Sequence, residues 1–540
     1  MRAFYCIWVF ILVVPVQIFA QLQFEWQIVY DAPETDSNNQ VLTSTEVVDM
    51  VTHKGKIYAA TSNWNNPLQP FKGQVIVKNS HTADWLLDVD PPGLISRASS
   101  IKSVVFQTDI NGQALVQPDT ILFIGLTTHD FSDSPYPGKV AWRNDSNGTW
   151  TYYDLDFSNH HLRRTEVRSM GFYRDKVTNA DIVFAGATPD PLGIFAGRYD
   201  ATQPNKIVWD NVAEFLPVNY ERILGFAECN GVLYAATKSR ILKRNDGHSV
   251  SQRWVELIDF KDPQYFNVYS QGLYSIYAND EDIRSFTTTT LYNPVREVLT
   301  FTTFNRLFHF DPLAETLIEE INLKDWLQTE TGNQYNYIQS GIISPFYTTQ
   351  NDTLQLIGIE AIFDTIYLAN NSQPNFEGID NKGFIIARQH LTNGTSNYQL
   401  LSISDPLFPN DTLTRVRTII NSPFQQEPVT IYTGGFAPWG NDVENTGWIY
   451  KGQLSQASSV YETEKSNELI IFPNPANTTI TISTDFLNEP YSVRIFNANG
   501  SLVLIKNNQN KIDISSLLSG VYLVCLQTNR GMVTRKMIKQ

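Results

Sequence analysis

The chain has 540 residues, of which 42% are hydrophobic and 18% are charged, so it is neither a disordered polymer nor short enough for one ordinary core. Its formal net charge of −15 excludes a general affinity for nucleic acid, which requires a basic surface, but leaves room for a local basic pocket. Aromatic residues make up 12% of the chain and accompany abundant Thr, Val and Ile, so an all-β fold is expected.

The first twenty residues, "MRAFYCIWVFILVVPVQIFA", have the pattern of a secretory signal peptide. Arg2 supplies a positive start, an apolar run follows, and the small residue Ala20 precedes the expected cleavage point. The alternative is a membrane anchor, but Pro15 and Gln17 interrupt the run, which favours cleavage. No later segment is apolar for long enough to span a membrane, so no transmembrane segment is expected in the mature chain.

Short strand-like phrases recur along residues 21–455 and indicate a repeat protein. The clearest pair is "KIYAATS" at 56–62 and "VLYAATK" at 232–238, in which small residues would let neighbouring backbones approach closely. The other copies are "ILFIGLTT" at 121–128, "IVFAGAT" at 182–188, "VLTFTT" at 298–303, "LQLIGIE" at 354–360 and "VTIYTGG" at 429–435. Each copy is the second of four expected strands, so the seven copies predict a seven-bladed β-propeller.

The last repeat lacks its fourth strand, and the strand that would complete it stands at the other end of the chain. The fourth strands often carry a tryptophan, and "FEWQIVYD" at Phe24–Asp31 has one at Trp26. We therefore expect Phe24–Asp31 to pair with the last blade and close the ring, which removes two exposed sheet edges. The tryptophans are expected to pack between blades rather than to bind a ligand.

The composition changes after the repeats. Residues 456–468 are polar and read as a linker, and residues 469–540 alternate strand patterns with Asn-Gly turns, which predicts a small β-sandwich. Taken from these residues alone, a carbohydrate-binding sandwich is an alternative. The two cysteines beyond the leader, Cys229 and Cys525, fall in different expected domains, so neither a disulfide framework nor a zinc site is expected.

Several motifs of residues 469–540 resemble the C-terminal sorting domain of the bacterial type IX secretion system. They are "FPNP" at 472–475, "IFNANG" at 495–500, "LLSGVYLV" at 517–524 and a basic ending at 535–539. The resemblance implies a cargo that crosses the inner membrane by its signal peptide and the outer membrane through the type IX machinery. Such cargo is released or held on the cell surface, and its sorting domain carries no catalytic residue.

One column of the repeat alignment is basic and predicts a ring of positive side chains at one mouth of the central channel. The column contains Arg168, Arg222, Arg284 and Arg417, with Lys102 and Gln339 aligned to it in two further blades. Guanidinium groups suit the recognition of carboxylate or sulfate by paired hydrogen bonds. The alternative is a purely structural ring, because Glu166 and Glu221 stand just before two of these arginines.

The loops expected on the same face carry further candidate binding residues. They are His129 and Tyr136 in the second blade and Trp439 in the seventh. No cofactor is expected. Calcium is left open, because Asp130, Asp442 and Glu444 are candidate ligands, although their spacing fits no calcium-binding motif.

Two functions remain open at this point. The first is a secreted or cell-surface protein that binds a polysaccharide or a protein ligand on the propeller face, since no catalytic motif stands out in the sequence. The second is a secreted lyase or hydrolase acting on an anionic glycan, in which the arginine ring would neutralise a uronate while His129 or Tyr136 takes a proton. The sequence alone does not decide between them.

Overall fold

A computed structural model describes the chain from residue 22 to its end, with gaps. The residues outside the description are 1–21, 63–71, 130–137, 156–163, 189–192, 217–221, 261–282, 304, 336, 348–352, 363–380, 392, 404–414, 437–445, 456–469, 484–490, 498–501 and 529–530. Two compact units are present, Met1–Ala457 and Ser458–Gln540. The expected signal peptide, 1–20, and the expected linker, 456–468, lie outside the described residues.

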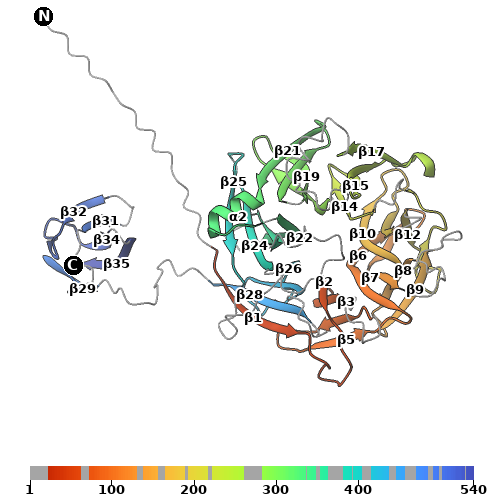
Figure 1. Cartoon of the computed structure of the whole chain (residues 1–540), viewed down its shortest axis with the longest axis horizontal. Coiled ribbons are helices and arrows are strands. Elements are labelled where there is room, and N and C mark those ends of the chain that lie inside the picture. The colour runs from red at the N-terminus through yellow and green to blue at the C-terminus, as the bar shows by residue number, and fades with distance from the viewer. Residues whose placement is uncertain are drawn as a thin grey trace, which may run out of the picture. The chain divides into compact units, whose positions relative to one another are not determined.

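The first unit is a seven-bladed propeller, and its first three blades share a few inter-blade bridges (Figure 1). Blade 1 contains β2 (Glu46–His53), β3 (Lys56–Ser62), β4 (Val75–Lys78) and β5 (Trp85–Val89). Blade 2 contains β6 (Ile95–Thr108), β7 (Ala114–His129), β8 (Gly138–Asn144) and β9 (Thr149–Leu155). Blade 3 contains β10 (Arg164–Arg174), β11 (Asp181–Thr188), β12 (Gly193–Tyr199) and β13 (Ile207–Trp209).

The other four blades are separate antiparallel sheets. Blade 4 contains β14 (Gly225–Cys229), β15 (Val232–Ala236), β16 (Arg240–Arg244) and β17 (Trp254–Asp259), with the 3-10 turn η1 (Val250–Gln252) before β17. Blade 5 contains β18 (Arg284–Leu291), β19 (Arg296–Thr303), β20 (Arg306–Asp311) and β21 (Thr316–Asn322). Blade 6 contains β22 (Tyr337–Tyr347), β23 (Thr353–Ile362), β24 (Asn381–His390) and β25 (Ser396–Leu401). Blade 7 contains β26 (Arg415–Asn421), β27 (Thr430–Phe436), β28 (Gly447–Leu454) and β1 (Phe24–Asp31).

The N-terminal strand closes the ring as predicted. β1 pairs antiparallel with β28, from Phe24 opposite Leu454 to Asp31 opposite Trp448. The ring of Trp26 packs over Gly452, where a Cβ atom would approach the indole to 2.5 Å. The prediction that the tryptophans pack between blades is confirmed for four fourth-strand tryptophans, each buried in a cluster that joins two blades: Trp26, Trp85, Trp209 and Trp254. Trp150, in the fourth strand of blade 2, is half-buried.

The recurring phrase forms the second strand of each blade, where small residues have a clear packing role. A Cβ atom on Gly125 of β7 would lie 2.5 Å from the carbonyl oxygen of Val167 in the next blade. A Cβ atom on Gly358 of β23 would lie 2.4 Å from the Val416 side chain in the same way. Because real atoms do not approach so closely, these positions must stay small for the inner strand of the following blade to pack against them.

One α-helix among the described residues was not predicted from the sequence. α2 (Leu323–Thr331) connects blade 5 to blade 6, with Asn322 as its N-cap and Gly332, whose φ of 72° is left-handed, as its C-cap. The Asn322 side chain accepts hydrogen bonds from the backbone N–H groups of Lys324 and Asp325, which caps the first turn.

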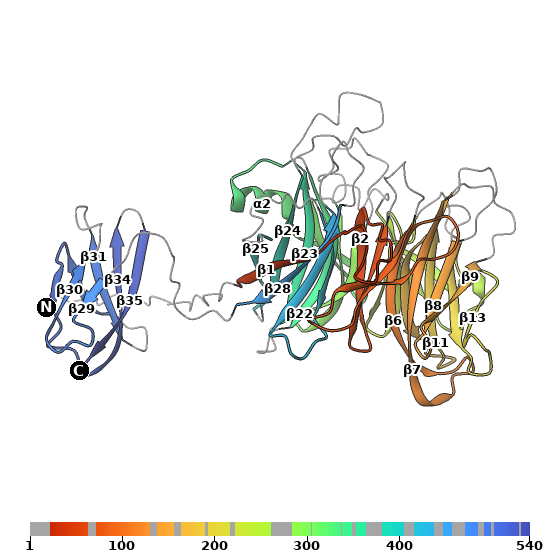
Figure 2. The same cartoon turned by 90° about the horizontal axis from the view of Figure 1, so that it is seen from below.

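The side view in Figure 2 shows the blade strands running roughly along the line of sight of Figure 1.

The second unit is a β-sandwich of two antiparallel sheets. One sheet has the order β29-β30-β33 and the other β32-β31-β34-β35. Their strands are β29 (Ile470–Phe472), β30 (Thr479–Ser483), β31 (Ser492–Asn497), β32 (Leu502–Asn507), β33 (Lys511–Asp513), β34 (Gly520–Thr528) and β35 (Gly531–Lys539). Inward-facing residues such as Ile480, Val493, Ile512 and Val524 form one buried cluster between the sheets.

Candidate functional site

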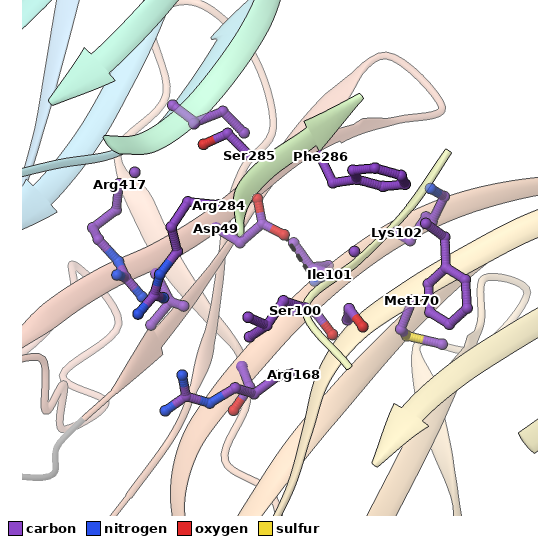
Figure 3. A pocket seen from close by; sticks show the side chains of 18 of the residues that line it. Asp49, Ser100, Ile101, Lys102, Arg168, Met170, Arg284, Ser285, Phe286 and Arg417 are labelled. Atoms are coloured by element: carbon purple, nitrogen blue, oxygen red, sulfur yellow. Dashed lines mark hydrogen bonds between the residues drawn. The ribbon is translucent and has the colours of Figure 1, made fainter. Parts of the chain in front are cut away.

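A cavity of about 480 Å³ occupies the centre of the propeller, and residues from the first strand of every blade line it. Figure 3 shows Arg168, Arg284 and Arg417, from three different blades, pointing into this space, while Lys102 lies apart from them. The arginines stand near the starts of their strands. Each strand start pairs with the end of the second strand of its own blade, as Glu166 does with Thr188. The arginines therefore define one end of the cavity, which we call the arginine tier.

The backbone places these arginines through a recurring irregularity. The first strands of all blades except blade 4 have a register irregularity near their starts, and Arg168 and Arg417 are the extra residues of the β-bulges in blades 3 and 7. Arg284 stands at the start of the corresponding irregularity in blade 5. In blade 2 the residue equivalent to Arg168 is Ser99. Lys102, which the sequence alignment had matched to Arg168, lies three positions further along the strand. A bulge re-aims a side chain without ending the strand, which suits residues that must face a cavity.

The other aligned residues fall outside the bulge position. Gln339 stands two residues before the bulge of blade 6, and Arg222 stands three residues before β14 begins. Neither residue lines the cavity. That earlier position is occupied in two other blades by Arg97 and Arg415, which do line the cavity and which the sequence analysis missed. A search for basic residues at both positions would have found them.

Three carboxylates balance part of the positive charge of the arginine tier. Glu46 accepts from two arginines, Arg97 at 3.1 Å and Arg417 at 2.8 Å. Arg415 pairs with Glu360 at 3.3 Å, and Arg168 pairs with Glu166 of its own strand. The pair of Arg168 with Glu166 is the one that the structural-ring alternative expected. With Arg284, the arginine tier contains five described guanidinium groups and three described carboxylates. The net charge of these eight side chains is +2.

Burial is the main influence on the acid–base properties of the arginines, and neighbouring charges add smaller effects. Burial lowers the pKa of Arg97 to about 10, and the Arg417 charge adds to the fall while Glu46 opposes it. Burial likewise lowers the pKa of Arg417 to about 10, with Glu46 opposing and Arg415 adding to the effect. The pKa of Arg415 is lowered by burial and by the nearby Arg284 charge, against the pull of Glu360. With a pKa of about 10, Arg97 and Arg417 remain protonated at neutral pH and repel each other.

A second pair of charges lies in the same cavity. Burial raises the pKa of Asp49 to about 6, although hydrogen bonds from the backbone N–H groups of Ile101 and Met50 lower it. Burial lowers the pKa of Lys102, and the charge of Asp49 opposes that shift. The Asp49 carboxylate is anchored at 2.9 Å to Met50 N and at 3.2 Å to Ile101 N. It therefore links blades 1 and 2.

Hydroxyl groups continue this link around the cavity. Side chains just after the bulges bond to the inner strand of the neighbouring blade. The contacts are Ser100 Oγ to Val167 O at 3.4 Å, Ser169 Oγ to Ile223 O at 3.0 Å, and Met50 N to Thr418 Oγ1 at 3.0 Å. The Oγ atoms of Ser285 and Ser340 lie 3.0 Å apart across blades 5 and 6. These bonds fix the inner strands, so the arginines project from a rigid frame.

The predicted loop residues add little to this geometry. His129 is the last residue of β7 and pairs with Arg164, but its side chain is not described. Tyr136 and Trp439 lie outside the described residues, as do the candidate calcium ligands Asp130, Asp442 and Glu444. Within the described ranges, no group of three or more His, Cys, Asp or Glu residues could hold a metal ion. No helix in the described part of the chain is long and apolar enough to cross the membrane.

Arginines with a different environment lie between the blades. Arg244 of blade 4 contacts Glu214 at 3.1 Å and Asp175 of blade 3 at 2.8 Å, and it also pairs with Asp246. Arg388 of blade 6 donates to Glu320 of blade 5 at 2.6 Å and 2.5 Å. Burial alone would lower the pKa of both arginines, but hydrogen bonds to these carboxylates raise it above its usual value.

The family comparison decides the nature of the second unit. Residues 470–540 match the family described as "Secretion system C-terminal sorting domain". The second unit is a type IX secretion sorting domain. This sorting domain confirms the resemblance found in the sequence, and it indicates that the protein is delivered to the cell surface or outside the cell. A comparison with curated proteins gives no match.

Solved structures similar to this chain include carbohydrate-active enzymes and an extracellular domain. The α-L-arabinofuranosidase Arb93A of Fusarium graminearum is 10% identical over 80% of this chain and 98% of its own, with a TM-score of 0.38. The α-L-arabinanase of Penicillium chrysogenum is 9% identical over 81% and 99%, also with a TM-score of 0.38. The extracellular domain of a hybrid two-component system from B. thetaiotaomicron is 11% identical over 94% and 69%, with a TM-score of 0.29.

Proposed function

We propose that this protein is a type IX cargo whose propeller binds an acidic polysaccharide at the arginine tier. The observation that carries the proposal is the charge surplus: five arginines and three glutamates among the described residues of this end of the cavity, within a chain of net charge −15. Buried like charges repel one another, so bound carboxylate or sulfate groups would relieve the repulsion.

The rigid frame supports binding without a large rearrangement. The first strands are held by hydrogen bonds between neighbouring blades, and they bring Arg97, Arg168 and Arg417 to one end of a cavity open to ligands of moderate size. Pre-organised donors lose less entropy on binding than mobile ones do. The sorting domain adds that the site acts at the cell surface or outside the cell, where acidic polysaccharides are accessible to it.

A second candidate is an enzyme that acts on an anionic glycan, and Asp49 is the observation that favours it. A carboxyl group with a pKa of about 6 can exchange a proton near neutral pH, and it lies in the same cavity as the arginines. Both carboxylate oxygens of Asp49 already accept backbone hydrogen bonds, from Met50 and Ile101, which points to a structural role. The binding function is therefore the one proposed first.

One experiment tests the proposal and separates it from the alternative. The purified full chain is titrated calorimetrically with polygalacturonate and with neutral dextran, and new reducing ends are counted in parallel. Binding of polygalacturonate alone, lost when Arg417→Gln removes one guanidinium, is the expected result. Equal binding of both polymers, or of neither, would contradict the proposal. New ends that vanish in Asp49→Asn would establish the enzyme instead.

A further inference from the structure

Two arginines of the arginine tier have N–H groups that meet no acceptor in the described part of the chain. The Nε atom of Arg97 and the Nε and Nη2 atoms of Arg415 are buried and have no hydrogen-bond partner among the described residues. Both residues line the cavity, and Arg97 is only 8% exposed. A buried donor without an acceptor is costly, and the cost is greater for a charged group. These three N–H groups therefore mark a place where acceptor oxygens are missing.

The surrounding charges show what kind of oxygen would fit. Glu46 is already shared between Arg97 and Arg417, and Glu360 is paired with Arg415. The positive charge of Arg97 also lowers the pKa of Arg415, although burial is the larger cause. An additional neutral acceptor would satisfy the N–H groups but leave the repulsion in place, whereas an oxyanion would relieve both.

The size of the cavity limits how much ligand can enter with that oxyanion. A volume of about 480 Å³ lies in the range of small-molecule sites, about 300–1,000 Å³, and is too small for a long polymer segment. Belts of inter-blade hydrogen bonds fix the wall on several sides, so the cavity cannot widen freely. A short, terminal piece of a saccharide fits these limits better than the middle of a chain.

We infer that the N–H groups of Arg97 and Arg415 bind one compact oxyanion, a carboxylate or a sulfate, at the end of an acidic saccharide. Glu46 is a positioning residue, because it holds Arg97 at 3.1 Å and Arg417 at 2.8 Å on either side of it. The inference rests on the proposed function and sharpens it. It specifies that Arg97 and Arg415 bind the charged group of the ligand, and that this group belongs to the terminal sugar of the saccharide.

Calorimetric titration of the purified full chain with small probes tests the inference. The probes are digalacturonate, its methyl ester, glucose 6-sulfate and unmodified glucose. Binding of digalacturonate but not of its ester is expected if a carboxylate is recognised, and binding of glucose 6-sulfate but not of glucose if a sulfate is. Equal binding of a charged probe and its neutral partner would overturn the inference, as would binding of none of the four.

Conservative variants then assign the contact to residues. Arg97→Lys and Arg415→Lys keep the charge but lose the planar donor pair, so each is expected to weaken binding of the preferred probe about tenfold or more. Glu46→Gln is expected to weaken it as well, through loss of positioning. Arg198→Gln, which removes a pair with Asp210 at 2.7 Å outside the cavity, is the matched control and is expected to bind normally.

The outcomes distinguish failure of the chain-end site from failure of the proposed acidic-polysaccharide binding. Polygalacturonate binding that persists unchanged in both lysine variants would overturn the chain-end site and leave the acidic-polymer function standing. Failure of every acidic ligand to bind would overturn both. Near-ultraviolet circular dichroism checks folding, and if a lysine variant does not fold, the comparison of digalacturonate with its ester on the unmodified chain still decides the inference.

Discussion

Arginines serve the propeller in two regions, and the regions differ in the charge around each guanidinium. Between blades, Arg244 meets three carboxylates and Arg388 meets both oxygens of Glu320, so the pKa of each arginine rises despite burial. In the arginine tier, Arg97 and Arg417 share the single carboxylate of Glu46, and the pKa of each falls to about 10 because of burial. The same side chain is saturated with acceptors in one region and short of them in the other.

This difference teaches how to separate structural charges from charges available to a ligand. A buried arginine surrounded by carboxylates contributes to blade packing, and removing it leaves uncompensated negative charge. A buried arginine that shares its carboxylate with another arginine can be removed at little cost, because the carboxylate keeps a partner. Substitutions in the two regions are therefore expected to differ in their effect on stability.

The largest effect is expected between blades 3 and 4. Arg244→Gln would remove the guanidinium that Asp175 contacts and leave Glu214 with Arg253, at 2.6 Å, as its nearest remaining arginine. Because both carboxylates are buried, the variant is expected to lower the free energy of unfolding by about 3–5 kcal/mol. Urea titration followed by tryptophan fluorescence measures it. A loss below about 1 kcal/mol, the size typical of a surface pair, would show that the cluster is not structural.

A smaller loss of stability is expected when Glu46, the carboxylate shared by two arginines of the arginine tier, is neutralised. Glu46→Gln leaves Arg97 and Arg417 without their carboxylate, so the free energy of unfolding should fall by about 2–4 kcal/mol. Because Glu46 also positions the arginines that would bind an oxyanion, added sulfate should stabilise the variant less than it stabilises the unmodified chain. Thermal unfolding with and without sulfate makes this comparison, and equal stabilisation of both proteins would contradict the positioning role of Glu46.

Acid should act first on the clusters between blades. Burial alone would raise the pKa of Asp175, but the backbone N–H of Thr178 and the Arg244 guanidinium hold it at about 2. A carboxylate with a depressed pKa contributes stability above its unfolded pKa, and that contribution, about 2 kcal/mol, is lost as the pH falls from about 4 to 2. Stability measured across this window should fall less steeply in Arg244→Gln; an unchanged slope would refute the assignment.

The smallest effect is expected for the arginine that shares its partner. Arg97→Gln leaves Glu46 paired with Arg417 at 2.8 Å and removes one of the repelling charges. The free energy of unfolding should therefore change by no more than about 1 kcal/mol, whereas binding of acidic saccharide should be lost. Calorimetric binding and urea unfolding of the same preparation test both halves of the expectation.

The architecture was predictable from the sequence because it repeats. Seven copies of one strand pattern, and a tryptophan strand displaced to Phe24–Asp31, imposed a closed ring that the pairing of β1 with β28 confirms. The sorting domain was predictable from a few short motifs, and the family match at 470–540 confirms it. The helix α2 was missed because its nine residues, Leu323–Thr331, are fewer than the roughly 11–18 over which a helical period becomes distinct.

The candidate site was predictable only in part, for a reason that lies in the backbone. Arg168, Arg284 and Arg417 were found because each stands at the same place in its repeat. Arg97 and Arg415 were missed because each stands two residues before a β-bulge that sequence spacing does not reveal, and Lys102 lies three positions beyond the bulge residue with which it was aligned. Which carboxylate pairs with which arginine depends on contacts between blades, and sequence spacing carries no information about those.

The most direct test compares one arginine from each region in the same assay. All 11 tryptophans precede the sorting domain, so tryptophan fluorescence reports the unfolding of the full chain's propeller without interference from its second unit. In urea, Arg244→Gln should lose about 3–5 kcal/mol of unfolding free energy, and Arg97→Gln should stay within about 1 kcal/mol of the unmodified chain. Equal losses in the two variants would show that the channel arginines are structural and would contradict the account.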